Sequence, residues 1–216
     1  FKSLLYQTLQ SETTSANGEN KPTGAQVGMG VRNSAITTVF KQGNLTAVTS
    51  DTAFAISGEG FFTVQGADGN TYYTRNGNFT FAEGVNGLTL ATTDGLPVLD
   101  SQGSPIVFAA NMTTSEITVT ADGQFCYPDA NNNPQPLGIT IGLTQFNNPG
   151  GLEKTDGSLF LETAASGTPL NEATNNNLQR SSIAQGYLEG SNVQVVDEMV
   201  NLITAQRAYE FSSKAI

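Results

Sequence analysis

The stretch that decides the fold runs from Ala55 to Phe81 and reads AISGEGFFTVQGADGNTYYTRNGNFTF. Apolar and polar residues alternate in short runs separated by glycines, which is typical of half-buried strands joined by tight turns. Adjacent strand residues point to opposite faces, so one of Phe61 and Phe62 can face the core while the other faces away. The aromatic residues after the glycine turn can pair with them across a hairpin. We interpret this stretch as a β-core signature and not as a ligand site.

Short strands of the same kind recur along most of the chain. Asp-Gly and Asn-Gly dipeptides separate them at intervals of roughly 8–10 residues, the spacing of consecutive hairpins. Such turns need positive φ angles, which Gly and Asn adopt at little cost. The dipeptides begin at Asp68, Asn76, Asn86, Asp94, Asp122 and Asp156. With a longer loop expected over residues 128–136 (PDANNNPQP), the sequence predicts a mainly β fold, an irregular β-sandwich or barrel-like domain.

The two ends of the chain differ from this middle part, because their apolar residues recur at helical spacing. We predict an N-terminal helical leg over residues 1–12 and a linker over 13–26. A β-rich domain is expected over 27–185, and a C-terminal helical leg over 186–216. The two legs leave the same domain, so we expect them to pack on each other as a short helical stalk.

The predicted helices carry apolar side chains for packing but lack capping residues at their outer ends. The C-terminal helix is expected to begin near Ser191 or Asn192, with one of them as its N-cap. The predicted contact residues are Leu4, Leu5, Leu9, Met199, Leu202, Ile203 and Tyr209. Because neither outer end is capped, we expect a fragment whose missing ends continue both helices. The plainer alternative is an ordinary pair of terminal helices.

Composition and charge narrow the class of protein. The chain has 216 residues, a net charge of −10, and charged residues at only 13% of positions. An acidic chain with scattered basic residues is a poor partner for nucleic acid or an anionic membrane. No apolar run approaches the ~20 residues that span a bilayer. We therefore expect no nucleic-acid partner, no membrane insertion and an extracytoplasmic, β-rich protein.

The residue types that carry most catalysis are missing or isolated. The chain has no histidine, which removes the usual general base, the commonest zinc ligand and a Ser-His-Asp triad. Its single cysteine, Cys126, has no disulfide partner within the chain and no histidine to activate it. A glycosidase pair could come from acids in or beside expected turns, namely Glu59, Asp68, Glu83 and Asp94. Acids are common in turns for conformational reasons, so we predict no enzyme activity and no catalytic residue.

Three further segments could hold a cofactor or a metal ion. GMGVRN (28–33) and GEGFFT (58–63) carry the first two glycines of a dinucleotide-binding fingerprint but lack the third. GEGFFT also leads into an apolar strand, whereas phosphate binding needs a helix N-terminus. DANNNPQ (129–135) lacks the ligand spacing of an EF-hand loop. We expect turn glycines, a plain loop, and no cofactor or metal.

The motifs resemble those of the bacterial flagellar rod and hook family. The family pattern Ile-x-Gly-x-Gly-Phe-Phe, a glycine turn, and Tyr-Thr-Arg-x-Gly-x-Phe falls on Ile56, Gly58, Gly60, Phe61, Phe62, Tyr73, Thr74, Arg75, Gly77 and Phe79. FKQGNL (40–45) and the C-terminal run over 186–216, with SNV, EMV, QRAYE and SKAI, are also similar to family segments. LLYQTL (4–9), GAQVGMGVR (24–32) and ETAASGTP (162–169) look like the distal rod members of the family.

The resemblance implies a structural subunit of the distal rod. Such a subunit polymerises into the axial drive shaft that transmits torque from motor to hook and lines the export channel. The implied partners are copies of itself in a helical rod, the proximal rod proteins, the hook protein, the P- and L-ring proteins and the flagellar type III export apparatus. The implied location is the flagellar basal body, from periplasm to outer membrane. Family members continue at both termini into coiled-coil segments, which this chain is expected to lack.

The resemblance also assigns roles to residues and leaves alternatives open. The motif residues Ile56, Gly58, Gly60, Phe61, Phe62 and Arg75 are expected to hold the β domain together. The chain could instead be a proximal rod or hook subunit, an extracytoplasmic glycan-binding or adhesive β domain, or a carbohydrate hydrolase. A binding module should show an exposed aromatic platform, and a hydrolase should show facing carboxylates in a cleft. A polymer subunit needs neither, but its apolar helical faces should run to both chain ends.

Overall fold

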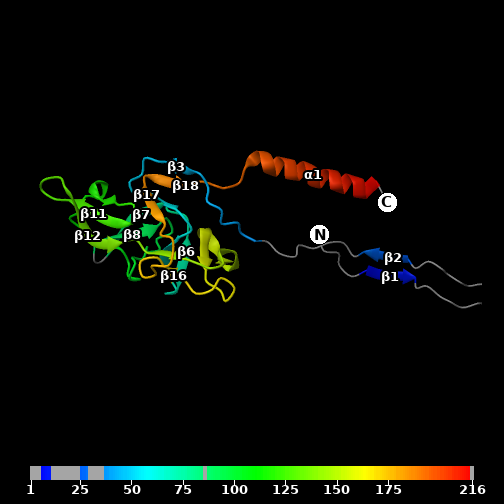
Figure 1. The fold of residues 1–216 in the computed structure, drawn as a ribbon, viewed down its shortest axis with the longest axis horizontal. Helices are drawn as coiled ribbons and strands as arrows, with labels where there is room; N and C mark the ends of the chain where they lie inside the picture. The colour runs from blue at the N-terminus through cyan, green and yellow to red at the C-terminus, as the bar shows by residue number, and fades with distance from the viewer. Residues whose placement is uncertain (1–5, 11–24, 29–36, 85–86, 215–216) are drawn as a thin grey trace, which may run out of the picture. The chain divides into compact units, whose positions relative to one another are not determined.

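The computed structural model describes residues 6–10, 25–28, 37–84 and 87–214 (Figure 1), and the fold is mainly β. The chain divides into two compact units, residues 1–39 and 40–216. The boundary lies later than the expected start of the β-rich domain at residue 27, because the strand at Ala25–Gly28 pairs within the first unit.

The first unit holds an antiparallel pair, β1 (Tyr6–Gln10) and β2 (Ala25–Gly28). The helix expected over residues 1–12 is therefore wrong at Tyr6–Gln10, where a strand forms. A helix this short is marginal by itself, and pairing with β2 satisfies the backbone of β1 instead. Residues 1–5 and 11–12 lie outside the described residues, as do most of the expected linker and residues 29–33 of GMGVRN.

A six-stranded antiparallel sheet forms the centre of the second unit. Its strands lie in the order β14 (Glu153–Lys154), β15 (Leu159–Leu161), β6 (Thr71–Thr74), β5 (Phe61–Gln65), β13 (Leu143–Gln145) and β16 (Leu170–Asn171). β5 and β6 form the hairpin predicted from the sequence, and Gly69 in its turn has a φ of 81°. The register places Phe62 beside Thr74 on one side and Leu143 on the other.

Smaller sheets surround this centre. One three-stranded sheet contains β7 (Phe79–Gly84), β8 (Gly87–Thr92) and β9 (Val107–Phe108). A second contains β10 (Thr118–Val119), β11 (Gln124–Pro128) and β12 (Pro134–Thr140). Two strand pairs complete the set, β17 (Ser182–Gln185) with β4 (Phe54–Ser57) and β18 (Tyr187–Glu189) with β3 (Leu45–Ala47). Among the described residues, three short 3-10 helices lie in the connections: η1 (Thr114–Glu116), η2 (Pro149–Gly151) and η3 (Asp156–Ser158). In the described part of the chain the strands form separate open sheets, so the domain is irregular and is not a closed barrel.

The two phenylalanines of GEGFF face opposite sides of β5, as predicted. Phe62 belongs to the main core cluster together with Ile56, while Phe61 belongs to a second cluster with Tyr73, Phe146 and Phe160. The ring of Phe79 lies 5.1 Å from that of Phe62 in an edge-to-face arrangement. This contact comes from β7, however, and not from across the β5–β6 hairpin.

The loop expected over residues 128–136 is wrong in its length, because most of these residues belong to a hairpin. β11 and β12 pair as far as Pro128 and Pro134, so only residues 129–133 form the turn. The carboxylate of Asp129 accepts the N–H groups of Asn131 and Asn133 at 2.8 and 3.1 Å, which closes the turn. Asn132 adopts a φ of 62°, a conformation that Asn tolerates better than most residues.

The C-terminal leg contains one α-helix, α1 (Val195–Lys214). It begins later than the predicted start at Ser191 or Asn192, and the first intrahelical bond runs from Glu198 N–H to Gln194 O at 3.1 Å. The expected caps are used elsewhere: Ser191 Oγ accepts the N–H of Val193, and Asn192 Nδ2 donates to Lys41 O. None of the helices in the described residues is long and apolar enough to cross a membrane.

Candidate assembly surface

The described residues of α1 are all exposed, including its large apolar side chains. Each of the following is at least half exposed: Val195, Val196, Met199, Val200, Leu202, Ile203, Tyr209 and Phe211. Fully burying one such side chain contributes about 1.5–3 kcal/mol, so together they represent on the order of 10 kcal/mol of unused hydrophobic free energy. Contiguous apolar surface of this kind marks an interaction site.

These apolar residues form one broad band on α1, called here the apolar band. At about 100° per residue they span roughly 200° of the helix circumference, with Met199 and Ile203 near the middle. The charged residues Arg207 and Glu210 fall in the same sector, so the band is uninterrupted from Val195 to Ile203 and mixed beyond it. Asn201 and Ala208 project on the opposite side of the helix. A band wider than half the circumference cannot be covered by a single neighbouring helix, which covers only a ~100°-wide stripe.

The structure locates some of the predicted helix contacts and not others. Met199, Leu202, Ile203 and Tyr209 all lie in the apolar band, at 60%, 62%, 51% and 76% exposure. Leu4 and Leu5 lie outside the described residues, and Leu9 is in β1 with its side chain not described. Packing between the two legs therefore remains a prediction.

Charge is distributed unevenly along the chain. Residues 40–190 contain 14 acidic and 4 basic residues, a net charge of −10, which equals that of the whole chain. The remaining residues therefore carry equal numbers of acids and bases, 5 of each. In α1, Asp197 and Glu198 lie in the first turn and Lys214 in the last, which suits the helix dipole. The apolar band thus belongs to a nearly neutral segment, and the acidic charge belongs to the β region.

Three of the described edge strands are poor sites for strand pairing with another molecule. Both edge strands of the six-stranded sheet, β14 and β16, are two residues long, and β14 is Glu153–Lys154. The edge strand β12 contains Pro134 and Pro136, which have no N–H to donate. Short, charged and proline-containing edges resist intermolecular pairing. The apolar band is therefore a better candidate for assembly than these three edges.

The glycines of the GEGFF motif allow close packing against a buried polar cluster. Gly60 N–H donates to Ser181 Oγ at 3.0 Å, and an added Cβ on Gly60 would lie 2.6 Å from Glu172 Oε1. The buried carboxylate of Glu172 accepts hydrogen bonds from Ser181 N, Ser181 Oγ and Gln145 Nε2 at 2.7–2.9 Å. No sequence signal distinguished Glu172 from the many exposed acids.

Arg75 is the polar centre of the same motif. Its Nε donates to Glu189 Oε2 at 2.8 Å, and its Nη1 donates to Gly58 O and Gly60 O at 2.9 and 3.0 Å. Its guanidinium carbon lies 5.8 Å from the centre of the Phe61 ring. The sequence pointed to Arg75 and both glycines but not to Glu189, which comes 114 residues later and completes the cluster.

The acids considered for catalysis do not form a pair. Glu59, Asp68, Glu83 and Asp94 are all exposed and belong to different turns or strand ends. Hydrogen bonds from the backbone and side chain of Asn70 and from the hydroxyl of Tyr72 lower the pKa of Asp68, as expected for a turn-forming carboxylate. Among the described residues, no group of three or more His, Cys, Asp or Glu could hold a metal ion.

Cys126 is buried in β11, with Phe125 as its fully buried neighbour in the main core. Burial raises the pKa of the Tyr73 hydroxyl to about 12, with a further contribution from the carboxylate of Glu162. The Cys126 thiol and the Tyr73 hydroxyl therefore both lie among the buried side chains of the β domain.

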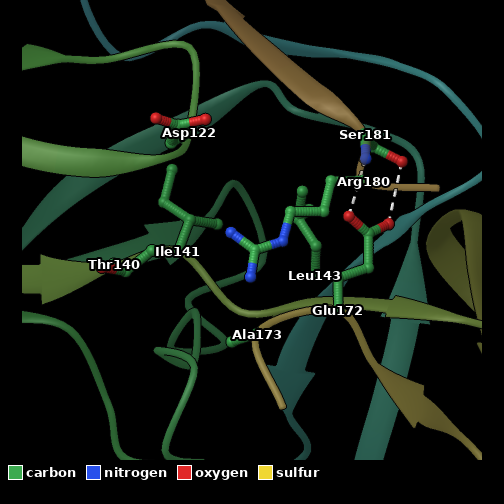
Figure 2. Close-up of a pocket in the computed structure, with 8 residues that line it drawn as sticks. All are labelled: Asp122, Thr140, Ile141, Leu143, Glu172, Ala173, Arg180 and Ser181. Carbon is green, nitrogen blue, oxygen red and sulfur yellow. Dashed lines mark hydrogen bonds between the residues drawn. The ribbon is translucent and has the colours of Figure 1, made fainter. Parts of the chain in front are cut away.

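The cavity in Figure 2 is small, and polar and apolar side chains line it together. Its volume is about 80 Å³, well below the ~300 Å³ at which ligand pockets begin. Figure 2 shows the guanidinium of Arg180 directed into it, while the carboxylate of Glu172 is directed to Ser181. Asp122 and Glu172 both line the cavity. The oxygens of Glu172 already accept hydrogen bonds from protein groups, so the two carboxylates are not a free pair for hydrolysis. This arrangement holds the chain together and does not resemble a hydrolase cleft.

An irregular β domain with packed glycines, acids used in turns, and an uncovered apolar helix defines a structural protein. Two family descriptions match the sequence: "Flagellar hook protein FlgE/F/G D1 domain" over residues 55–127 and "Flagellar basal body rod FlgEFG protein C-terminal" over residues 184–216. The first match contains the GEGFF motif and Arg75, and the second contains α1 and Glu189.

Curated relatives match along the full length. The flagellar basal-body rod protein FlgG of Buchnera aphidicola subsp. Schizaphis graminum is 39% identical, covering 100% of this chain and 80% of the relative. FlgG of Caulobacter vibrioides is 38% identical and FlgG of Borreliella burgdorferi 36% identical, each covering 100% of this chain and 79% of the relative. The chain belongs to the flagellar basal-body rod family of structural proteins, in its FlgG branch.

Proposed function

We propose that this chain is a structural subunit of the distal rod, which polymerises into the axial drive shaft of the bacterial flagellum. The observation that carries the proposal is the apolar band of α1, which no described residue of the chain covers to the point of burial. Membership of the FlgG branch supports the same function. The subunit works by packing and stiffness, without catalysis, to transmit torque from motor to hook.

The width of the apolar band favours a polymer over a dimer. A twofold dimer would cover one stripe of each helix, whereas a band of roughly 200° needs neighbours on at least two sides. Contacts between unlike surfaces of identical copies repeat without closing and generate helical filaments. Helices packed in this way form a continuous wall, and such a wall would line the export channel.

The proposed domain organisation follows from the same contacts. The legs at residues 1–12 and 186–216 would pack together and with neighbouring copies, with residues 13–26 as a linker and the β-rich region outward of the wall. β1 and the strand β18 show that neither leg is helical throughout its predicted range. The contact residues are those of the apolar band, with Met199 and Ile203 at its centre.

The proposed partners follow the position of a distal rod. They are further copies of this chain, proximal rod proteins at one end, the hook protein at the other, P- and L-ring proteins around the shaft, and the type III export apparatus that delivers the subunits. The shaft would run from the periplasm to the outer membrane. The net charge of −10 supports the absence of nucleic-acid partners.

A glycan-binding module fits the structure less well. Among the described residues between 40 and 190, Tyr187 is the one aromatic residue whose side chain is largely exposed. Glycan platforms use several exposed aromatic rings, since each ring supplies large, rigid contact area. The exposed apolar surface of this chain is concentrated in α1 instead.

The test is a charge substitution in the apolar band of the full-length protein. Met199→Asp with Ile203→Asp should abolish polymerisation in sedimentation and electron microscopy, because two carboxylates cannot be buried at the interface. The β domain should remain folded by circular dichroism. The matched control is Asn201→Asp with Ala208→Asp, which adds two acids on the opposite side of α1 and should retain polymerisation. Polymers formed by the first variant as readily as by the control would contradict the assignment.

Electron microscopy of hook–basal bodies from a deletion strain places the subunit within the structure. We expect particles with a short rod and no hook, restored by a plasmid copy of the gene. A complete rod that lacks only the hook would identify a hook subunit. A rod interrupted nearer its base would identify a proximal rod subunit, and unchanged motile cells would contradict any structural role in the flagellum.

A further inference from the structure

We propose that Arg75 and Glu189 form a latch, a set of contacts that holds the start of the C-terminal leg at β18 against the loop over residues 56–60, which is called here the GEGFF loop. The idea that this latch passes torque into the β domain rests on the proposed function, whereas the latch itself does not. The latch is defined as Arg75, Glu189 and the backbone of Gly43, with the carbonyl groups of Gly58 and Gly60.

The two chain segments that lead to the legs run side by side at this point. β3 and β18 are antiparallel, with Leu45 opposite Glu189, so the ends that continue toward both legs lie at the same end of this two-stranded ribbon (Figure 1). The pairing extends beyond the strands, because Gly190 N–H donates to Asn44 O at 2.8 Å. Asn192 Nδ2 then donates to Lys41 O at 2.7 Å. Residues 41–47 and 187–192 are therefore one connected strip.

Two glycines allow the strip to close tightly. A Cβ on Gly43 would overlap the carbonyl oxygen of Gly190. The side chain of Glu189 contacts the backbone at this glycine, because its Oε1 accepts the N–H of Gly43 at 2.9 Å. Glu189 thus joins the incoming segment to the outgoing one, while its other oxygen, Oε2, binds Arg75.

Arg75 connects this strip to the core motif. Its side chain is only 14% exposed and that of Glu189 only 11%, so the pair is largely removed from water. Nη1 binds the carbonyl oxygens of Gly58 and Gly60, whereas Nη2 is buried without a hydrogen-bond partner among the described residues. A buried ion pair adds little net stability compared with apolar packing, but breaking it by removing one partner is strongly destabilising. This balance fits a positioning role.

Gln42 attaches the incoming segment to the same loop. Its Nε2 donates to Ile56 O at 3.1 Å, and its Oε1 accepts the N–H of Gly58 at 3.2 Å. Both segments therefore reach the loop over residues 56–60, one through Gln42 and the other through Glu189 and Arg75.

The position of the latch determines what it resists. A force on either leg reaches the Leu45 and Glu189 end of the β3–β18 ribbon first, because that end continues into the legs. Peeling the ribbon from this end breaks one contact at a time. It begins with the bond of Asn192 to Lys41 and must then release Glu189 from Gly43 and Arg75 before β3 and β18 can separate. The latch therefore makes the ribbon and the core motif move together when the legs are loaded.

The test is amide hydrogen exchange of the unassembled chain, followed by NMR in Arg75→Lys. Lysine keeps the charge but cannot bind a carboxylate and two carbonyl groups with one planar fork. The reporter amides are Gly43 and Gly190, which hydrogen-bond within the strip, and Val48, which donates to Gly186 O just beyond it. We expect their exchange to become roughly tenfold to a hundredfold faster, the range for losing hydrogen bonds to a charged group. The core amides Leu90 and Val98 should keep their rates.

Two further variants make the result specific. Glu189→Gln keeps the size of the side chain and removes the charge, so it should accelerate the same three amides to a smaller extent. Arg207→Lys is the matched control, because Arg207 is an exposed arginine in α1, and it should leave the reporters unchanged. Unchanged reporters in both latch variants, or equal acceleration of the core amides, would overturn the latch. Since the chain is unassembled throughout, a failure of the distal-rod assignment would not alter this outcome.

Discussion

The backbone of Gly77 lies directly against that of Phe54. Phe54 N–H donates to Gly77 O at 2.9 Å, and a Cβ added to Gly77 would overlap the carbonyl oxygen of Phe54. The next nearest atom to that Cβ position beyond Phe54 is in the Phe62 ring, at 3.1 Å. A glycine is therefore required here by space and not by its φ angle.

Gly77→Ala should lower the free energy of unfolding by about 2–4 kcal/mol, because two backbone segments must move apart in the core. Urea denaturation followed by circular dichroism measures the change. Gly150→Ala is the matched control, since the nearest atom to an added Cβ there is Asn148 Oδ1 at 3.6 Å. A loss as small in Gly77→Ala as in the control would show that the segments separate easily.

Phe62 and Phe211 should respond in opposite ways to truncation. Phe62 is fully buried at 0% exposure, whereas Phe211 in the apolar band is 72% exposed. Phe62→Ala should cost about 3–5 kcal/mol of unfolding free energy, and Phe211→Ala should cost no more than about 0.5 kcal/mol. Phe211→Ala should instead raise the protein concentration needed for polymerisation. A large loss of monomer stability in Phe211→Ala would mean that the band is covered within the chain.

Polymerisation should depend on salt with a definite sign. Residues 40–190 carry the entire net charge of −10, so neighbouring copies repel each other through their β regions. Raising the salt concentration from about 0.01 to 0.15 M shortens the screening length from about 30 to 8 Å and should promote assembly. Sedimentation at several salt concentrations measures this. Assembly that weakens with added salt would instead indicate ion pairs between copies.

Tyr73 should make the stability fall at high pH. Its pKa is raised to about 12 by burial and by Glu162, against an ordinary value of 10.0, so the folded state holds the proton more tightly than the unfolded state. The stabilisation is complete below pH 10 and is lost as the pH rises through about 12, a total of roughly 3 kcal/mol.

Urea denaturation between pH 9 and 12 (a range set by those two values) tests this dependence. Tyr73→Phe should flatten the decline because it removes the titrating hydroxyl. Tyr209→Phe, at a tyrosine that is 76% exposed, is the control and should leave the decline as it is. An equal effect of both substitutions would assign the decline to other groups.

The local signals in the sequence were sufficient for the hairpins and for the core. The Asp68-Gly69 and Asp122-Gly123 turns do join paired strands, and both glycines have φ near 80°. The alternation in GEGFF placed Phe61 and Phe62 on opposite faces of β5. These features depend on neighbours within about ten residues, which a single sequence contains.

The features that depend on distant partners could not be predicted. Asn76-Gly77 looked like another hairpin turn, but Gly77 is needed where Phe54 approaches. β1 forms because β2 is available to pair with it, which helical spacing over residues 1–12 does not reveal. Arg75 stood out, yet its partner Glu189 follows 114 residues later and looks like any acid before a glycine.

The uneven distribution of charge gives this chain the character of an amphiphile. Its net acidic β region is the head group, and the nearly neutral apolar band of α1 is the tail. Head groups that repel each other occupy more area than the tails they carry, and such molecules pack into curved assemblies with the heads outside. Crowding of like charges would therefore favour a narrow tube over a flat sheet, and the radius of that tube would respond to ionic strength.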